Sequence, residues 1–265
     1  MNKKLLGVLG GLGPTASARF YFLLTEFTKA SCDQEHIDMI MCSIPSVPDR
    51  TAFIKDNNNQ DPLPSLKRYI RLLLDMGVDI ISIPCNTAEY FYYELQKIIK
   101  VPIIKTSFET VSFAVNSGAT KVGIMATEGA LKSNIYQKAC ERFNLKYEIL
   151  SKKAQDILNK IIYEKIKKSL SPNICDFLYV AEELYSKGCD FIILGCTELS
   201  LIPYSDIFKK YNFIDSLTVL AIKSVELCGY DLSDVAKEYI KIKRSGTRNE
   251  NIRFTYLGNR IFPFL

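Results

Sequence analysis

The sequence predicts an α/β fold of two pseudo-symmetric halves, each a parallel sheet with helices on both faces, with the active site in the cleft between them. The main observation is a stretch that occurs twice. Residues 77–85 and 188–196 each begin with a Gly-x-Asp turn, continue with a short apolar run rich in isoleucine, and end at a cysteine, Cys85 or Cys196. Such a run is too short for a helix and is typical of a strand buried on both faces.

Two further echoes support a duplication. Gly7 and Gly13 recur as glycines 116 residues later, and residues 103–106 resemble residues 213–216 at an offset of 110. Because the echoes come in one order, a duplicated βα half with right-handed crossovers explains them best. We therefore expect three parts, which are residues 1–106 with 212–230 as the first half, 107–211 as the second half, and 231–265 as a C-terminal helix and tail.

The elements of the first half follow from local signals. Residues 5–9 form an apolar strand before the turn Gly10-Gly11-Leu12-Gly13-Pro14, and the proline suits the first turn of a helix to about residue 29. The polar stretch 45–60, which carries Asp49-Arg50, is expected to be a loop. After Cys85, Asn86 or Thr87 is expected to cap a helix to about residue 100. The other expected elements are strands over 37–43 and 101–105 and helices over 64–76 and 107–117.

The second half repeats this plan. Its expected elements are a strand from residue 121 that ends in a turn at 127–130, a helix to about 142, a strand over 147–150, helices over 152–168 and 173–187, and the strand before Cys196.

Composition is that of an ordinary globular protein. The chain has 265 residues, of which 48% are hydrophobic and 24% charged, and a formal net charge of +5. No apolar run approaches the roughly 18 residues of a membrane span, and the short N-terminal run lacks the cleavage site of a signal peptide. Basic residues gather near the end of the chain without a nucleic-acid-binding motif. We expect a cytoplasmic protein that contacts neither membrane nor nucleic acid.

The chain offers few groups for metal or disulfide chemistry. Its eight cysteines include no C-x-x-C pair, and a chain without an export signal is not expected to form disulfides. His36 is the only histidine, which argues against a metal site and a catalytic triad. Six cysteines have the apolar or helical surroundings of small buried side chains. Cys85 and Cys196 differ because they are paired and follow equivalent strands.

The N-terminal glycine turn has two interpretations. Gly11-x-Gly13-x-x-Ala16 fits the dinucleotide fingerprint loosely, but that fingerprint needs an acid at the end of the second strand, where this chain has Cys42-Ser43. Backbone N–H groups at a helix start also hold simple anions, including an amino-acid carboxylate. We prefer the anion interpretation.

Two thiols at equivalent strand ends suit proton transfer at both faces of one carbon. In open parallel sheets, ligands bind at the carboxyl ends of the strands. A thiolate on one side would take a Cα proton while a thiol on the other side gives one to the opposite face, which inverts the carbon. The helix start after each cysteine is expected to favour its thiolate. The alternative is that Cys85 and Cys196 are two core residues at equivalent positions.

Four motifs in order resemble the aspartate/glutamate racemase family. They span about residues 5–228 and are Gly10-Gly11-Leu12-Gly13-Pro14, Ser46-Val47-Pro48-Asp49-Arg50-Thr51, Pro84-Cys85-Asn86-Thr87-Ala88 and Gly195-Cys196-Thr197-Glu198-Leu199. The chain looks most like the aspartate branch, since glutamate racemases typically have Cys-Thr-His at the second site. The resemblance implies two flavodoxin-like halves, a homodimer, no pyridoxal phosphate or other cofactor, and Cys85 and Cys196 as the acid/base pair.

The resemblance also implies contacts to an amino-acid substrate. Arg50, whose planar fork suits a carboxylate, would bind the substrate side chain together with a lysine before the second cysteine strand. The match points to Lys167, with Lys165 and Lys168 as alternatives. The remaining substrate contacts fall on Gly11, Asn86, Thr87, Thr127, Thr197 and Glu198.

Two departures from the family pattern leave the substrate open. Glu89 stands where the family usually has histidine, and it is either a favourable acid in a first helical turn or a specificity residue that repels an acidic substrate. Ala130 stands where relatives often have threonine. We expect a racemase of aspartate, with glutamate second. The alternatives are another two-cysteine enzyme, such as a maleate isomerase or hydantoin racemase, and a non-catalytic amino-acid-binding protein.

Overall fold

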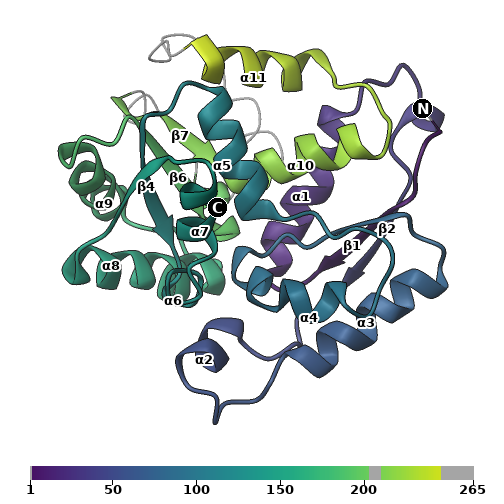
Figure 1. The fold of residues 1–265 in the computed structure, drawn as a ribbon, viewed down its shortest axis with the longest axis horizontal. Helices are drawn as coiled ribbons and strands as arrows, with labels where there is room; N and C mark the ends of the chain where they lie inside the picture. The colour runs from purple at the N-terminus through teal and green to yellow at the C-terminus, as the bar shows by residue number, and fades with distance from the viewer. Residues whose placement is uncertain (1, 203–209, 246–265) are drawn as a thin grey trace.

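The computed structural model describes residues 2–202 and 210–245 and contains two parallel sheets flanked by helices, which confirms the predicted fold class (Figure 1). The strands are β1 (Leu6–Gly10), β2 (Met39–Ser43) and β3 (Ile80–Ser82) in the first sheet, and β4 (Lys121–Ala126), β5 (Lys146–Ile149), β6 (Phe191–Gly195) and β7 (Phe213–Asp215) in the second.

The first sheet has the strand order β2-β1-β3, and all its pairs are parallel. The strand expected over 101–105 is reduced to one parallel bridge between Ile81 and Ile103. Pro102 contributes only its carbonyl, which accepts a 2.9 Å hydrogen bond from Ile81 N, because proline has no N–H to extend a ladder.

The second sheet has the order β5-β4-β6-β7, again all parallel. The sequence predicted that residues 212–230 belong to the first half. This is wrong for the strand of that segment, because β7 pairs with β6 of the second half, where Phe213 lies opposite Ile192. This pair is the counterpart of the bridge between Ile81 and Ile103. The echo between residues 103–106 and 213–216 therefore marks equivalent edges of two sheets.

The helices cover both sheets and fill the space between them. They are α1 (Pro14–Phe27), α2 (Arg50–Lys55), α3 (Leu63–Asp75), α4 (Tyr92–Gln96), α5 (Thr106–Asn116), α6 (Glu128–Lys132), α7 (Ile135–Arg142), α8 (Lys152–Asn159), α9 (Ile174–Ser186), α10 (Ser216–Leu227) and α11 (Asp234–Ser245). Figure 1 shows α1, α5 and α10 in the middle of the molecule, and α10 packs against both α1 and α5. As predicted, Pro14 occupies the first turn of α1.

Two local predictions are wrong. The polar stretch 45–60 contains α2, whose first turn is capped by Asp49 through a 2.8 Å bond from Ala52 N. After Cys85, neither Asn86 nor Thr87 caps a helix. Cys85 itself takes the cap position, without a side-chain cap bond, and a 3₁₀ segment over Asn86–Phe91 precedes the short α4.

The largest hydrophobic cluster joins the two halves. It includes Leu6 and Val8 of β1, Ile124 of β4, Ile193 of β6 and Leu220 of α10, all less than 1% exposed. Burial of this apolar surface stabilises the halves as one body. The cluster thereby fixes the carboxyl ends of β3 and β6 relative to each other.

None of the helices in residues 2–202 and 210–245 combines the length and hydrophobicity that a bilayer span requires.

Candidate active site

Both cysteines line one small cavity. Cys85 reaches it from the carboxyl end of β3 in the first half, and Cys196 from the carboxyl end of β6 in the second. Nine of the eleven predicted site residues line this cavity, and only Gly11 and Glu89 do not. Its walls are Leu12, Asp49, Arg50, Thr51, Cys85, Asn86, Thr87, Thr127, Tyr163, Lys167, Cys196, Thr197 and Glu198.

Cys196 is buried, and its surroundings favour the protonated thiol. Its Sγ donates a hydrogen bond to Glu198 Oε2 at 3.0 Å. Burial raises the pKa of the Cys196 thiol well above its ordinary value, and the negative charge of Glu198 raises it further, against the lowering effect of Lys167. The prediction that the following helix start favours a thiolate is wrong for Cys196, because burial and the Glu198 carboxylate raise the pKa of the thiol more than the backbone N–H of Glu198 lowers it.

Glu198 is the centre of the polar contacts on this wall. Its carboxylate also accepts from Thr197 Oγ1 at 3.3 Å and lies 3.5 Å from Lys167 Nζ. Gly13 makes room for it, because a Cβ at that position would lie 2.6 Å from Glu198 Oε1. The sequence indicated Glu198 as a substrate contact, whereas the structure places it against the sulfur of Cys196.

The Cys85 wall carries hydroxyl and amide groups. Thr87 Oγ1 lies 2.8 Å from Thr127 Oγ1, so the ends of β3 and β4 meet across the two halves. Thr127 also caps α6, since its hydroxyl accepts from Ala130 N. Thr87 thus stands two positions after Cys85 where Glu198 stands two positions after Cys196, and the pseudo-symmetry stops at the thiols.

Asn86 has both ends of its amide engaged by the protein. Its Oδ1 accepts from Tyr136 Oη at 2.6 Å, and its Nδ2 donates to Ser216 Oγ at 2.9 Å. Nothing in the sequence pattern indicated Tyr136 or Ser216, because both are more than 45 residues from Asn86. The predicted role of Asn86 as a substrate contact competes with these bonds.

Arg50 is buried and only partly satisfied. Its Nη1 donates to Val47 O at 3.0 Å and Pro48 O at 2.9 Å, and its Nη2 donates to Leu12 O. Its Nε is buried and has no hydrogen-bond partner among the described residues. A guanidinium has five N–H donors, so the Nε hydrogen and one Nη2 hydrogen remain. Neighbouring donors of this kind bind a carboxylate in bidentate fashion.

Lys167, rather than Lys165 or Lys168, lines the cavity. A π-helical segment over Lys160–Lys165 and a 3₁₀ turn over Ile166–Lys168 replace the end of the expected helix. Such interruptions of a helix often occur at functional sites. Burial lowers the pKa of Lys167, but the negative fields of Glu198 and other cavity groups outweigh it, so the pKa is raised overall.

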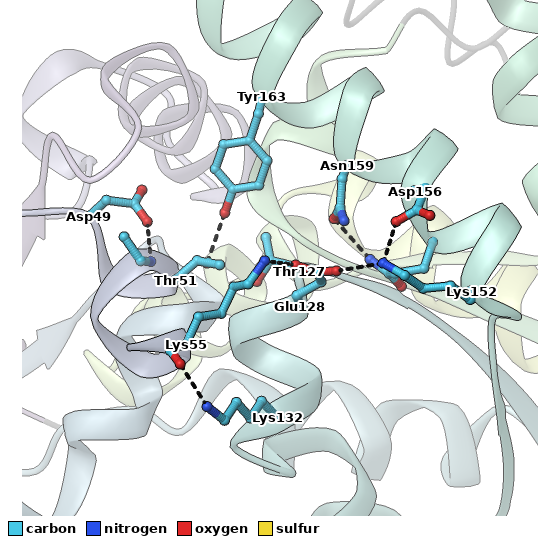
Figure 2. Close-up of polar contacts among 12 residues, drawn as sticks. Asp49, Thr51, Lys55, Thr127, Glu128, Lys132, Lys152, Asp156, Asn159 and Tyr163 are labelled. Carbon is cyan, nitrogen blue, oxygen red and sulfur yellow. Dashed lines mark hydrogen bonds and ion pairs between the residues drawn. The ribbon is translucent and has the colours of Figure 1, made fainter. Parts of the chain in front are cut away.

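The segment around α2 supplies Asp49, Arg50 and Thr51 to the cavity wall, and Figure 2 shows its polar contacts with the second half. Thr51 accepts a 2.8 Å hydrogen bond from Tyr163 of the π-helical segment. Lys55 forms an ion pair with Glu128, and its carbonyl accepts from Lys132 Nζ at 3.1 Å. Helix α2, which the sequence did not predict, thus connects the two halves at the cavity.

The two remaining candidates lie outside the cavity. Glu89 lines a second small space, which Cys85 also lines, and it caps α5, where it accepts from Ser107 N at 2.8 Å and from Ser107 Oγ. Burial raises the pKa of Glu89. Gly11 lies in an outer groove beside the cavity, and its N–H already donates to Ser17 Oγ at 2.8 Å. The anion site expected at this turn therefore lacks that donor.

No group of three or more His, Cys, Asp or Glu side chains with metal-binding geometry occurs within the described ranges. The polar groups of the cavity are two thiols, two carboxylates, two cations and several hydroxyls. This set suits proton transfer on a small charged molecule.

Comparisons with known proteins agree with this chemistry. The family model described as Asp/Glu/Hydantoin racemase matches residues 9–223. The broad specificity amino-acid racemase RacX of Bacillus subtilis is 27% identical over 239 residues, which are 83% of this chain and 96% of that protein. The glutamate racemase of Hydrogenobaculum is 34% identical over 139 residues, about half of each chain. The structure of Picrophilus torridus aspartate racemase aligns with a TM-score of 0.75 and 26% identity, covering 91% of this chain and 99% of that one.

Proposed function

Because the chain belongs to the Asp/Glu/hydantoin racemase family, we propose that it racemises an acidic amino acid, aspartate first, without pyridoxal phosphate. One observation carries the proposal: Cys85 and Cys196, from equivalent strand ends of the two halves, line the same cavity. A racemase needs an acid and a base on opposite faces of Cα, and two thiols from opposite walls meet that need. The homodimer implied by the family resemblance stays a prediction.

In one direction, a Cys85 thiolate takes the Cα proton and becomes a thiol. The electron pair left on Cα then takes the proton of the Cys196 thiol from the opposite face, which leaves Cys196 as the thiolate. Burial and Glu198 keep Cys196 protonated beforehand, so it is ready to act as the acid in this direction.

In the other direction Cys196 must first lose its proton. Glu198, 3.0 Å from the sulfur, is the acceptor that we assign. Cys85 enters this direction as the thiol, after it has taken a proton from solvent. The Cys196 thiolate then takes the Cα proton, and Cys85 gives its proton to the opposite face and becomes the thiolate again. Afterwards Glu198 releases its proton to solvent, which restores the starting state.

Arg50 supports a substrate with a side-chain carboxylate. Its buried Nε has no hydrogen-bond partner among the described residues, and a buried donor without a partner costs about 1–3 kcal/mol. A carboxylate that accepts from Nε and Nη2 removes this cost. We assign Thr87, Thr127 and Thr197, whose hydroxyls line the cavity, to the α-carboxylate and ammonium.

The second candidate is a racemase of broad specificity. Lys167 Nζ lies 3.5 Å from Glu198 and 4.0 Å from Asp49, so carboxylates of the protein already balance its charge. The charge that remains for an acidic side chain is then that of Arg50 alone. A weak preference for acidic substrates would follow.

The test is racemisation and Cα deuteration in D₂O, starting separately from L- and D-aspartate, without added pyridoxal phosphate. Cys85→Ala and Cys196→Ala should each abolish racemisation, while Cys175→Ala, which changes an exposed thiol, should not. Activity retained by either of the first two variants rejects the two-thiol mechanism. A panel of glutamate, asparagine, lysine, maleate and hydantoins separates the alternatives, and binding without exchange would indicate an amino-acid-binding protein.

A further inference from the structure

Tyr136 lies between the two cysteine segments without lining the cavity. It belongs to α7 and is fully buried. Its hydroxyl and its ring contact different catalytic segments, one in each half of the molecule. Its neighbours suggest a role in the separation of the two thiols.

The hydroxyl of Tyr136 is tied to the Cys85 side. It donates to Asn86 Oδ1 at 2.6 Å, and Asn86 directly follows Cys85. The amide continues the chain of bonds, since Nδ2 donates to Ser216 Oγ, which donates to Leu194 O at 2.7 Å. Leu194 lies on β6, two residues before Cys196, so the chain of bonds runs from one cysteine segment to the other.

The ring of Tyr136 is tied to the Cys196 side. A Cβ at Gly195, the residue directly before Cys196, would lie 2.7 Å from Cε2 of the ring. The ring therefore lies against the backbone at Gly195, in space that any larger residue would occupy. A glycine at this position is required by the close approach of the ring.

We propose that Tyr136 is a positioning residue, a rigid spacer that sets the separation of Cys85 and Cys196 by bonding to Asn86 and packing against Gly195. The proposal rests on the proposed two-thiol function. A tyrosine ring has few rotatable bonds, and burial raises the pKa of this phenol, so the hydroxyl stays protonated and donates. Its donation fixes which end of the Asn86 amide faces α7.

The separation matters because both thiols must reach one carbon. A displacement of about 1 Å in such a site costs roughly a hundredfold in rate. Tyr136→Phe keeps the ring and removes the bond to Asn86. We expect kcat for racemisation to fall roughly tenfold to a hundredfold, with KM changed less than about threefold, because Arg50 and Lys167 are untouched. Gly195→Ala keeps the bond to Asn86 but displaces the ring of Tyr136. It should likewise lower kcat and change KM little.

The matched control is Tyr230→Phe. Tyr230 is also a buried tyrosine, and its hydroxyl bonds to Asp38, next to the start of β2 and at the opposite end of the first sheet. Tyr230→Phe loses two hydrogen bonds with Asp38, one accepted from its N–H and one donated to its carboxylate, so it should lose at least as much thermal stability as Tyr136→Phe. Only Tyr136→Phe should lower kcat.

A second measurement does not depend on activity. Hydrogen exchange followed by mass spectrometry should show faster exchange in a peptide over 83–91 of Tyr136→Phe, with exchange of α3 unchanged. The proposal is overturned if residues 83–91 of Tyr136→Phe exchange as slowly as in the wild type. It is also overturned if they exchange faster while the kcat of the variant is unchanged. If the wild-type protein racemises no amino acid, the proposed function is rejected instead. The exchange data then still test the contacts of Tyr136.

Discussion

The Cys196 sulfur lies 3.0 Å from Glu198 Oε2, and the thiol donates its hydrogen bond to that carboxylate. Two positions after Cys85, where the second half has Glu198, stands Thr87, whose hydroxyl lies beside Thr127. The two thiols of this duplicated fold are therefore chemically unequal. Burial and the Glu198 carboxylate raise the pKa of the Cys196 thiol, which favours its protonated form before substrate binds.

Glu198→Gln should make the Cys196 thiol more acidic and yet slow racemisation. The carboxylate raises the thiol pKa, so its removal lowers that pKa, but glutamine cannot take the proton. The thiol pKa can be measured from ultraviolet thiolate absorbance, by comparing Cys85→Ala with Cys85→Ala/Glu198→Gln. Glu94→Gln, a change in an exposed ion pair, is the control. A Glu198→Gln enzyme as fast as the wild type would contradict proton transfer to Glu198.

Arg50→Lys should reduce the preference for aspartate over asparagine. A lysine cannot offer the paired Nε and Nη2 donors, and a hydrogen bond to a charged group contributes about 2 kcal/mol, or roughly thirtyfold in kcat/KM. The measurement is kcat/KM for both amino acids. Arg68→Lys, on α3, is the control. If kcat/KM falls equally for both amino acids, Arg50 does not bind the substrate side chain and only holds the loop carbonyls to which it donates.

Glu89→Ala should destabilise the protein and leave substrate preference unchanged. Glu89 caps α5 through Ser107, and it lines a small space beside Cys85 rather than the substrate cavity. Loss of such a cap costs about 1 kcal/mol, which urea unfolding can measure. A changed ratio of aspartate to asparagine activity would restore Glu89 as a specificity residue.

The free energy of unfolding should fall as the pH rises above about 9. Burial raises the pKa of Cys140 and Cys228 to about 12 and that of Cys189 to about 11. These thiols keep their protons in the folded state at a pH where the unfolded chain has released them, so stability is full below the ordinary thiol pKa and is lost above it. Lys243 acts in the opposite direction, since burial lowers its pKa to about 8.

The stabilising effect of one lysine does not offset the destabilising effect of three thiols. The free energy of unfolding should therefore decrease with pH above pH 9. Urea unfolding at a series of pH values measures it. Cys140→Ala should make the slope shallower, and Cys175→Ser, at an exposed position, should not. A stability that is flat or rising between pH 9 and 11 would contradict the burial of these thiols.

Local patterns predicted most of the fold. Apolar runs indicated β1, β3, β4 and β6, and the repeated Gly-x-Asp turns placed Cys85 and Cys196 at equivalent strand ends. The polar stretch over 45–60 concealed α2, because a short helix that packs across to another half has no long apolar periodicity of its own. The cap expected after Cys85 was wrong because Asn86 bonds to Tyr136 and Ser216 instead.

The sequence by itself determined the duplicated α/β plan and the two thiols at its strand ends, since hydrophobic periodicity and turn residues act over short distances along the chain. The family resemblance pointed to Lys167, and tertiary structure decided between it and the neighbouring lysines. Tertiary structure alone decided that Arg50 keeps a buried donor without a partner among the described residues, and that Tyr136 connects the two cysteine segments. These contacts join residues far apart in the chain. They depend on how the two sheets pack, which no local pattern encodes.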